Sequence, residues 1–146
     1  MILYLDTSAL VKRYVRETGS QEVVALIKQA DTVGAVVLTQ VEMAATLAKA
    51  ARQKWVERKD AESAWQDFLD HWLSFTRLAL TPAMLERTSR LAWEYGLRGY
   101  DALHFSAVLT WQDTLETPVT LATFDRELWL AAENRGVLVW PEGLYS

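Results

Sequence analysis

The feature that most constrains the fold of this chain is the alternation of short apolar runs with longer helical patterns. The runs span residues 2–5, 33–38, 77–80, 119–122 and 137–140. Short buried strands that alternate with helices form right-handed βαβ units, and such units build a parallel sheet covered on both faces. The sequence therefore predicts an α/β fold with three layers, α/β/α, around a short parallel sheet.

The segments between these runs carry the residue types that start and stop helices. Thr81-Pro82 is typical of a helix start, with Pro in the first turn, and Gly96 is typical of a helix end. Thr39 is expected to cap another helix. We expect helices after Asp6, after Gly19, over about 40–54, over about 60–75, from 82 to about 96, over 101–112 and from 125 to about 136.

Length and composition predict one domain over residues 1–146. A chain of 146 residues that is 51% hydrophobic has the usual size of one domain with its own core. The absence of Cys excludes a disulfide scaffold and a thiolate metal site. The apolar run at 2–5 is too short for a signal peptide, and no run reaches the roughly 18 apolar residues of a membrane span. We therefore expect a soluble, cytoplasmic protein with no membrane partner.

Four carboxylates stand where strands end or the following helices begin. Asp6 and Asp125 follow predicted strands, while Glu42 and Asp101 lie in the first turns of predicted helices. In open parallel sheets ligands bind outside the carboxyl ends of the strands, so the four side chains are expected to converge there, closely enough to share a metal ion. Each Asp could instead simply cap a helix, and Glu42 could point to solvent. The conjunction of all four favours a shared site.

Carboxylates that lie close together need a compensating positive charge. Their mutual repulsion raises their pKa values unless a cation offsets it, and oxygen ligands suit hard divalent ions. With no Cys and only two His, a tetrahedral zinc site is poorly supplied. Mg²⁺ or Mn²⁺ fits better, and such an ion can activate water for phosphodiester hydrolysis.

Several segments together resemble one known family. The opening LDTSALVKRY, the mid-chain Glu42, the segment RGYDALHFSAV and the segment TFDREL follow one another as in the PIN domain of VapC-type toxins. The resemblance covers essentially the whole chain and implies Mg²⁺- or Mn²⁺-dependent RNA cleavage, a homodimer and inhibition by an antitoxin protein. It assigns Asp6, Glu42, Asp101 and Asp125 to the acidic quartet of the family, and Ser8 to a small hydroxyl residue that supports the first acid.

Other residues near the quartet are candidates for supporting roles. His104 follows Asp101 by three residues and could reach the site, although a packed, hydrogen-bonded histidine is an equal alternative. The net charge of −4 means that any positive charge for a phosphate must be local. Arg98 and Arg126 flank the acids and are better candidates for this contact than the basic stretch at 49–59, which also fits a solvated helix face.

The aromatic stripe Trp65, Phe68, Leu69 and Trp72 predicts burial against a neighbouring helix or a partner chain rather than stacking on bases. This stripe, together with the homodimer that the resemblance implies, is the basis for expecting a homodimer. The same stripe could also close the core of the monomer.

Alternative functions are less well matched by the sequence. A phosphatase with Asp6 as the nucleophile would usually have a second acid where Ser8 stands. A receiver-type signalling domain would need an acid pair after the first strand. A PIN module that binds RNA or protein without catalysis stays open, although an intact quartet argues against it.

Overall fold

The computed structural model describes residues 1–146 and contains one sheet of five parallel strands in the order β3-β2-β1-β4-β5. The strands are β1 (Ile2–Leu5), β2 (Thr32–Val36), β3 (Thr76–Leu78), β4 (Thr120–Ala122) and β5 (Leu138–Trp140). β1 lies in the middle, with Leu3 paired to Val33 of β2 and to Thr120 of β4. Because all strands run in the same direction, their carboxyl ends lie along one edge.

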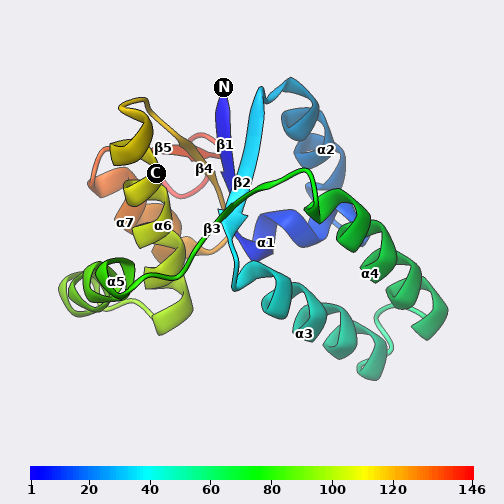
Figure 1. Cartoon of the computed structure of the whole chain (residues 1–146). Helices are drawn as coiled ribbons and strands as arrows, with labels where there is room; N and C mark the ends of the chain where they lie inside the picture. The colour runs from blue at the N-terminus through cyan, green and yellow to red at the C-terminus, as the bar shows by residue number, and fades with distance from the viewer.

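Helices cover both sides of this sheet. Helices α1 to α4 lie on one side and α5 to α7 on the other (Figure 1). The helices are α1 (Thr7–Leu10), followed by the 3₁₀ turn η1 (Val11–Arg13), α2 (Ser20–Gln29), α3 (Thr39–Arg52), α4 (Arg58–Trp72), α5 (Pro82–Tyr95), α6 (Gly99–Leu115) and α7 (Arg126–Asn134). The predicted three-layer α/β/α class is confirmed.

The structure corrects several predicted boundaries. β2 ends at Val36 and β3 at Leu78, two residues earlier than each apolar run. After Val36 the chain turns, and the N–H of Val37 forms one further hydrogen bond to the neighbouring strand, to the Leu78 carbonyl. Thr39 does not cap α3: it is the first helical residue, and its hydroxyl is buried without a hydrogen-bond partner. Apolar residues thus run past the strand ends into the turns, where Val37 and Leu80 are exposed.

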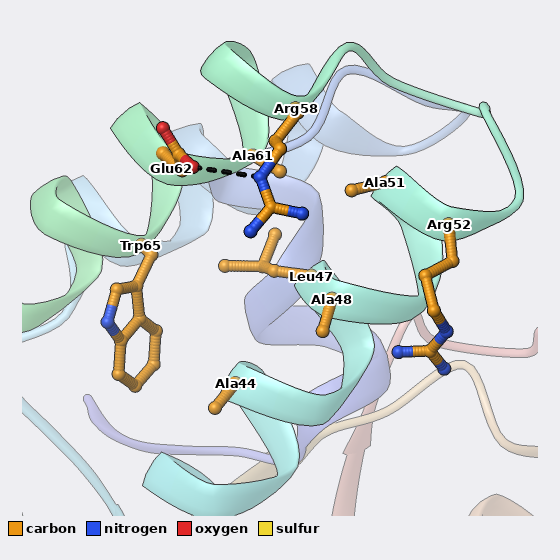
Figure 2. Close-up of a pocket in the computed structure, with 9 residues that line it drawn as sticks. All are labelled: Ala44, Leu47, Ala48, Ala51, Arg52, Arg58, Ala61, Glu62 and Trp65. Atoms are coloured by element: carbon orange, nitrogen blue, oxygen red, sulfur yellow. Dashed lines mark hydrogen bonds and ion pairs between the residues drawn. The ribbon is translucent and has the colours of Figure 1, made fainter.

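The aromatic stripe of α4 lies largely inside the chain. Phe68 and Trp72 are buried, and Trp65 stacks on Phe68 with ring centroids 5.5 Å apart. Trp65 also lines a groove of about 410 Å³ between α3 and α4, whose walls include four alanines and whose rim carries Arg52 and the Arg58–Glu62 ion pair (Figure 2). The stripe therefore closes the core of the monomer, and it no longer supports a homodimer.

None of the helices has both the length and the apolar character needed to cross a bilayer.

Candidate active site

All four predicted acids line one pocket at the carboxyl edge of the sheet. The pocket has a volume of about 440 Å³. Asp6 follows β1 directly, Asp125 precedes α7, and Glu42 and Asp101 lie in the first turns of α3 and α6. The predicted convergence on one rim is thus seen in the structure, although the four side chains come from four separate elements.

Asp6 is buried and its two carboxylate oxygens are both held by hydroxyl groups. Ser8 Oγ donates to Asp6 Oδ1 at 2.7 Å, and Thr123 Oγ1 donates to Asp6 Oδ2 at 2.5 Å. The backbone N–H of Ala9 also donates to Oδ1, so Asp6 caps α1 as well. The support of Asp6 by Ser8 that the resemblance implies is therefore present in the contacts.

The two hydroxyl groups are themselves oriented by backbone donors. The N–H of Phe124 donates to Ser8 Oγ at 2.9 Å, and the N–H of Asp125 donates to Thr123 Oγ1 at 3.0 Å. Each hydroxyl proton is thereby left free to point at Asp6. Sequence reasoning missed Thr123; its position at the end of β4, two residues before Asp125, was the available signal.

Arg98 links two of the acids. Its Nε donates to Asp101 Oδ2 at 2.8 Å and its Nη2 donates to Asp125 Oδ2 at 2.7 Å. The Arg98 side chain is 57% exposed and lies over the ring of Tyr100, whereas the Asp101 side chain is only 4% exposed. Asp125 also caps α7 through Leu128 N. Arg98 therefore stands at the mouth of the pocket, where the sequence placed it.

Glu42 is held by His104. His104 Nε2 lies 2.7 Å from Glu42 Oε1, and His104 Nδ1 lies 2.7 Å from the hydroxyl of Tyr4. The histidine is 2% exposed, so the packed, hydrogen-bonded alternative describes it, yet one of its partners is a predicted site residue. Tyr4 was not foreseen, because a tyrosine in a central strand looks like core from sequence.

The charges in the pocket shift the pKa values of its buried groups. Burial raises the pKa of Asp6, against the opposing effects of His104, Thr123 and Ser8. Burial also raises the pKa of Asp101, to which the charges of Asp125 and Asp6 add. For His104, burial lowers the pKa, but the hydrogen bond and charge of Glu42 outweigh it and the net shift is upward. Such shifts are typical of functional sites.

Two expectations are not met. Arg126 does not line the pocket; its guanidinium lies over the ring of Tyr145. In addition, no three His, Asp or Glu side chains stand close enough together to hold one ion. Three of these acids are already engaged by other side chains, because Arg98 bridges Asp101 and Asp125 and His104 bonds to Glu42.

The fold and the site together define the class of protein. The fold has three layers, α/β/α, and acidic side chains from four elements meet at the carboxyl edge of its sheet. The chain belongs to the PIN domain family, which it matches over residues 3–133. It is 34% identical to Ribonuclease VapC45 of Mycobacterium tuberculosis, over 98% of this chain and 97% of that protein.

Solved structures share the fold. The crystal structure of PAE2754 from Pyrobaculum aerophilum matches with a TM-score of 0.66 and 26% identity, over 95% of this chain and 83% of the other. The structure of VapBC2 from Rickettsia felis, bound to a DNA fragment from its promoter, matches with a TM-score of 0.64 and 14% identity, over 95% and 97% of the two chains.

Proposed function

We propose that this protein is a metal-dependent endoribonuclease and the toxin of a toxin–antitoxin pair. The observation that carries the proposal is the pocket lined by Asp6, Glu42, Asp101 and Asp125. Its counterpart in sequence is the near full-length similarity to a protein named as a ribonuclease.

The donor set suits Mg²⁺ or Mn²⁺. Carboxylate oxygens are the ligands that these hard cations prefer, and a nearby positive charge would offset the burial that raises the pKa values of Asp6 and Asp101. We propose these two as the direct ligands. A bound ion would activate water and offset the charge of a phosphodiester.

We propose that the two more exposed acids are the ones that meet the incoming water and substrate. The side chains of Glu42 and Asp125 are 18% and 20% exposed, against 4% for Asp101. Either one could orient or deprotonate the attacking water. We propose that Arg98, whose side chain is 57% exposed, contacts a phosphate of the RNA.

The geometry favours attack by water over attack by the RNA 2′-hydroxyl. The second route typically uses two general acid–base groups, often histidines. Both ring nitrogens of His104 are already hydrogen-bonded, and His71 lies elsewhere, bonded to Tyr14 at 2.9 Å. We therefore expect products with a 5′-phosphate and a 3′-hydroxyl.

Incubation of the purified protein with total RNA in Mg²⁺, Mn²⁺ or EDTA tests the proposal. We expect cleavage with either ion, none in EDTA, and none with Asp6→Ala. Cleavage in excess EDTA, or 2′,3′-cyclic phosphate ends, would contradict the mechanism. RNA binding without cleavage under all conditions would instead support the non-catalytic PIN module.

Partners of this chain are proposed from family membership. We expect a cognate antitoxin protein, whose addition should suppress cleavage, and a homodimer. Sedimentation at micromolar concentration checks the second expectation, and a monomer there would contradict it.

A further inference from the structure

A buried chain of hydrogen bonds runs from the central sheet to Glu42. The N–H of Val36, the last residue of β2, donates to the Tyr4 hydroxyl oxygen at 3.2 Å. That hydroxyl lies 2.7 Å from His104 Nδ1, and His104 Nε2 lies 2.7 Å from Glu42 Oε1. Tyr4 is fully buried and His104 nearly so.

The Glu42 carboxylate fixes the direction of these bonds. A carboxylate only accepts, so His104 Nε2 carries a proton and donates it to Glu42. On a neutral ring Nδ1 is then an acceptor, and the Tyr4 hydroxyl, which accepts from Val36 N–H, donates its own proton to it. A charged imidazolium would also carry a proton on Nε2, so this donation does not depend on the charge of the ring.

We propose that Tyr4 and His104 are positioning residues that hold the Glu42 carboxylate in place for the nuclease reaction. The inference deepens the proposed function and rests on it. His104 lines the pocket, but it is 2% exposed and both of its ring nitrogens are engaged, so it has no free nitrogen to offer to a water or a phosphate. It acts through Glu42.

The chain of bonds also ties together the elements that carry three of the acids. Tyr4 stands two residues before Asp6 on β1, and His104 stands three residues after Asp101 on α6. Glu42 belongs to α3, which begins shortly after β2 ends. A shift of α3 against α6 would break the bond between His104 and Glu42, so this bond fixes the spacing of the acids across the pocket.

The chain contains a matched control for this contact. The hydroxyl of Tyr14 lies 2.9 Å from His71 Nδ1, which is the same kind of pair, but neither residue lines the acidic pocket. Tyr4→Phe and His104→Leu remove the proposed contacts, whereas Tyr14→Phe and His71→Leu remove the control contact. His104→Gln restores a side-chain N–H that can donate to Glu42.

Calorimetric titration with Mn²⁺ and steady-state cleavage kinetics test the positioning role. Loss of groups that orient the side chains around a metal costs about 10- to 100-fold in metal affinity or activity. Because Glu42 is proposed to act on the attacking water and not as a direct ligand, we expect His104→Leu and Tyr4→Phe to lower kcat about tenfold with little change in KM, and to leave Mn²⁺ bound at Asp6 and Asp101. His104→Gln should recover most of kcat, and the Tyr14 and His71 variants should match the unaltered protein.

The pH profile separates positioning from acid–base catalysis. Glutamine does not titrate, so His104→Gln should keep the pH profile of kcat/KM. Loss of one limb of that profile would overturn the proposal, as would full kcat in a folded His104→Leu variant.

Nitrogen-15 NMR of the histidine rings tests the contact without ion or RNA. We expect a protected, downfield His104 Nε2–H signal that moves in Glu42→Gln and stays in His71→Leu. A signal unaffected by Glu42→Gln would overturn the proposal. If the unaltered protein bound no Mn²⁺ and cleaved no RNA, the proposed function would fail, while this signal would still decide whether His104 holds Glu42.

Discussion

At the scale of single residues, capping a helix and serving a pocket are compatible roles. In both Asp6 and Asp125, Oδ1 accepts a hydrogen bond from a backbone N–H at the start of a helix. In both residues Oδ2 accepts a hydrogen bond from a side chain. A carboxylate has lone pairs enough for both. Capping potential read from sequence is therefore no evidence against a functional role.

Thr123→Val should destabilise the protein and impair the site together. The substitution keeps the side-chain shape but removes the hydroxyl that donates to Asp6 and accepts from Asp125 N–H. Loss of a buried partner costs about 1–3 kcal/mol, which urea unfolding would measure. Thr114→Val, which loses an exposed hydroxyl bond to the Thr110 carbonyl, is the control and should change the free energy of unfolding far less.

The raised pKa values of two carboxyl groups predict an unusual pH dependence of the stability of the protein when a chelator removes metal ions. Burial raises the pKa values of Asp6 and Asp101 above the usual 3.8. At a pH between the unfolded-state pKa and the raised folded-state pKa, the folded protein binds more protons than the unfolded chain. The stability that these two carboxyl groups contribute is therefore present at low pH and is lost as the pH rises. The raised pKa of His104 acts in the same direction at higher pH, because its contribution to stability is also lost as the pH rises.

Thermal melts in EDTA across mildly acidic to neutral pH check this dependence. We expect Asp101→Asn to gain stability relative to the unaltered protein as the pH rises, because the variant has no charge to bury there. A constant difference between the two proteins across this range would contradict the assignment.

At the scale of elements, β2 depends on a glycine because α6 packs tightly on it. A Cβ built on Gly34 would lie 2.6 Å from Trp111 Cη2 and 2.8 Å from the Thr76 carbonyl oxygen. Helix α6, which carries Trp111, is buried over most of its length, and Thr76 belongs to the strand β3 that pairs with Gly34. The glycine is required for this close approach.

Gly34→Ala should lower the free energy of unfolding by about 1–3 kcal/mol, the usual cost of overpacking a filled core. Denaturant unfolding followed by circular dichroism would measure it. Gly99→Ala is the matched control, since a Cβ there meets nothing within 4 Å and the backbone needs no left-handed conformation. Equal effects of the two substitutions would show that the close contacts of Gly34 with Trp111 and Thr76 are not the cause.

At the scale of the whole molecule, ion binding should be coupled to folding. An ion that binds only the folded pocket stabilises it by mass action, by about 2.7 kcal/mol at one hundred times its Kd. We expect Mg²⁺ or Mn²⁺ to raise the Tm, and Asp6→Asn and Asp101→Asn to abolish the rise. An unchanged rise in both variants would refute the metal proposal, and the exposed Asp113→Asn variant controls for nonspecific binding.

The sequence by itself determined the fold class and identified the four acidic residues that line the pocket. Periodicity distinguishes buried strands from helices, and parallel strands necessarily bring the residues after β1 and β4 to the same edge. These are local or topological facts, so Asp6 and Asp125 could be placed without coordinates.

Only the tertiary structure decided how the pocket is held together. The contacts of Tyr4 with His104, of His104 with Glu42, and of Thr123 with Asp6 join residues 62 to 117 positions apart. The same is true of the aromatic stripe on α4, whose Phe68 and Trp72 could face either the core or a partner until α3 was seen packed against them. Side-chain direction and long-range packing settle such contacts, and no local pattern encodes either.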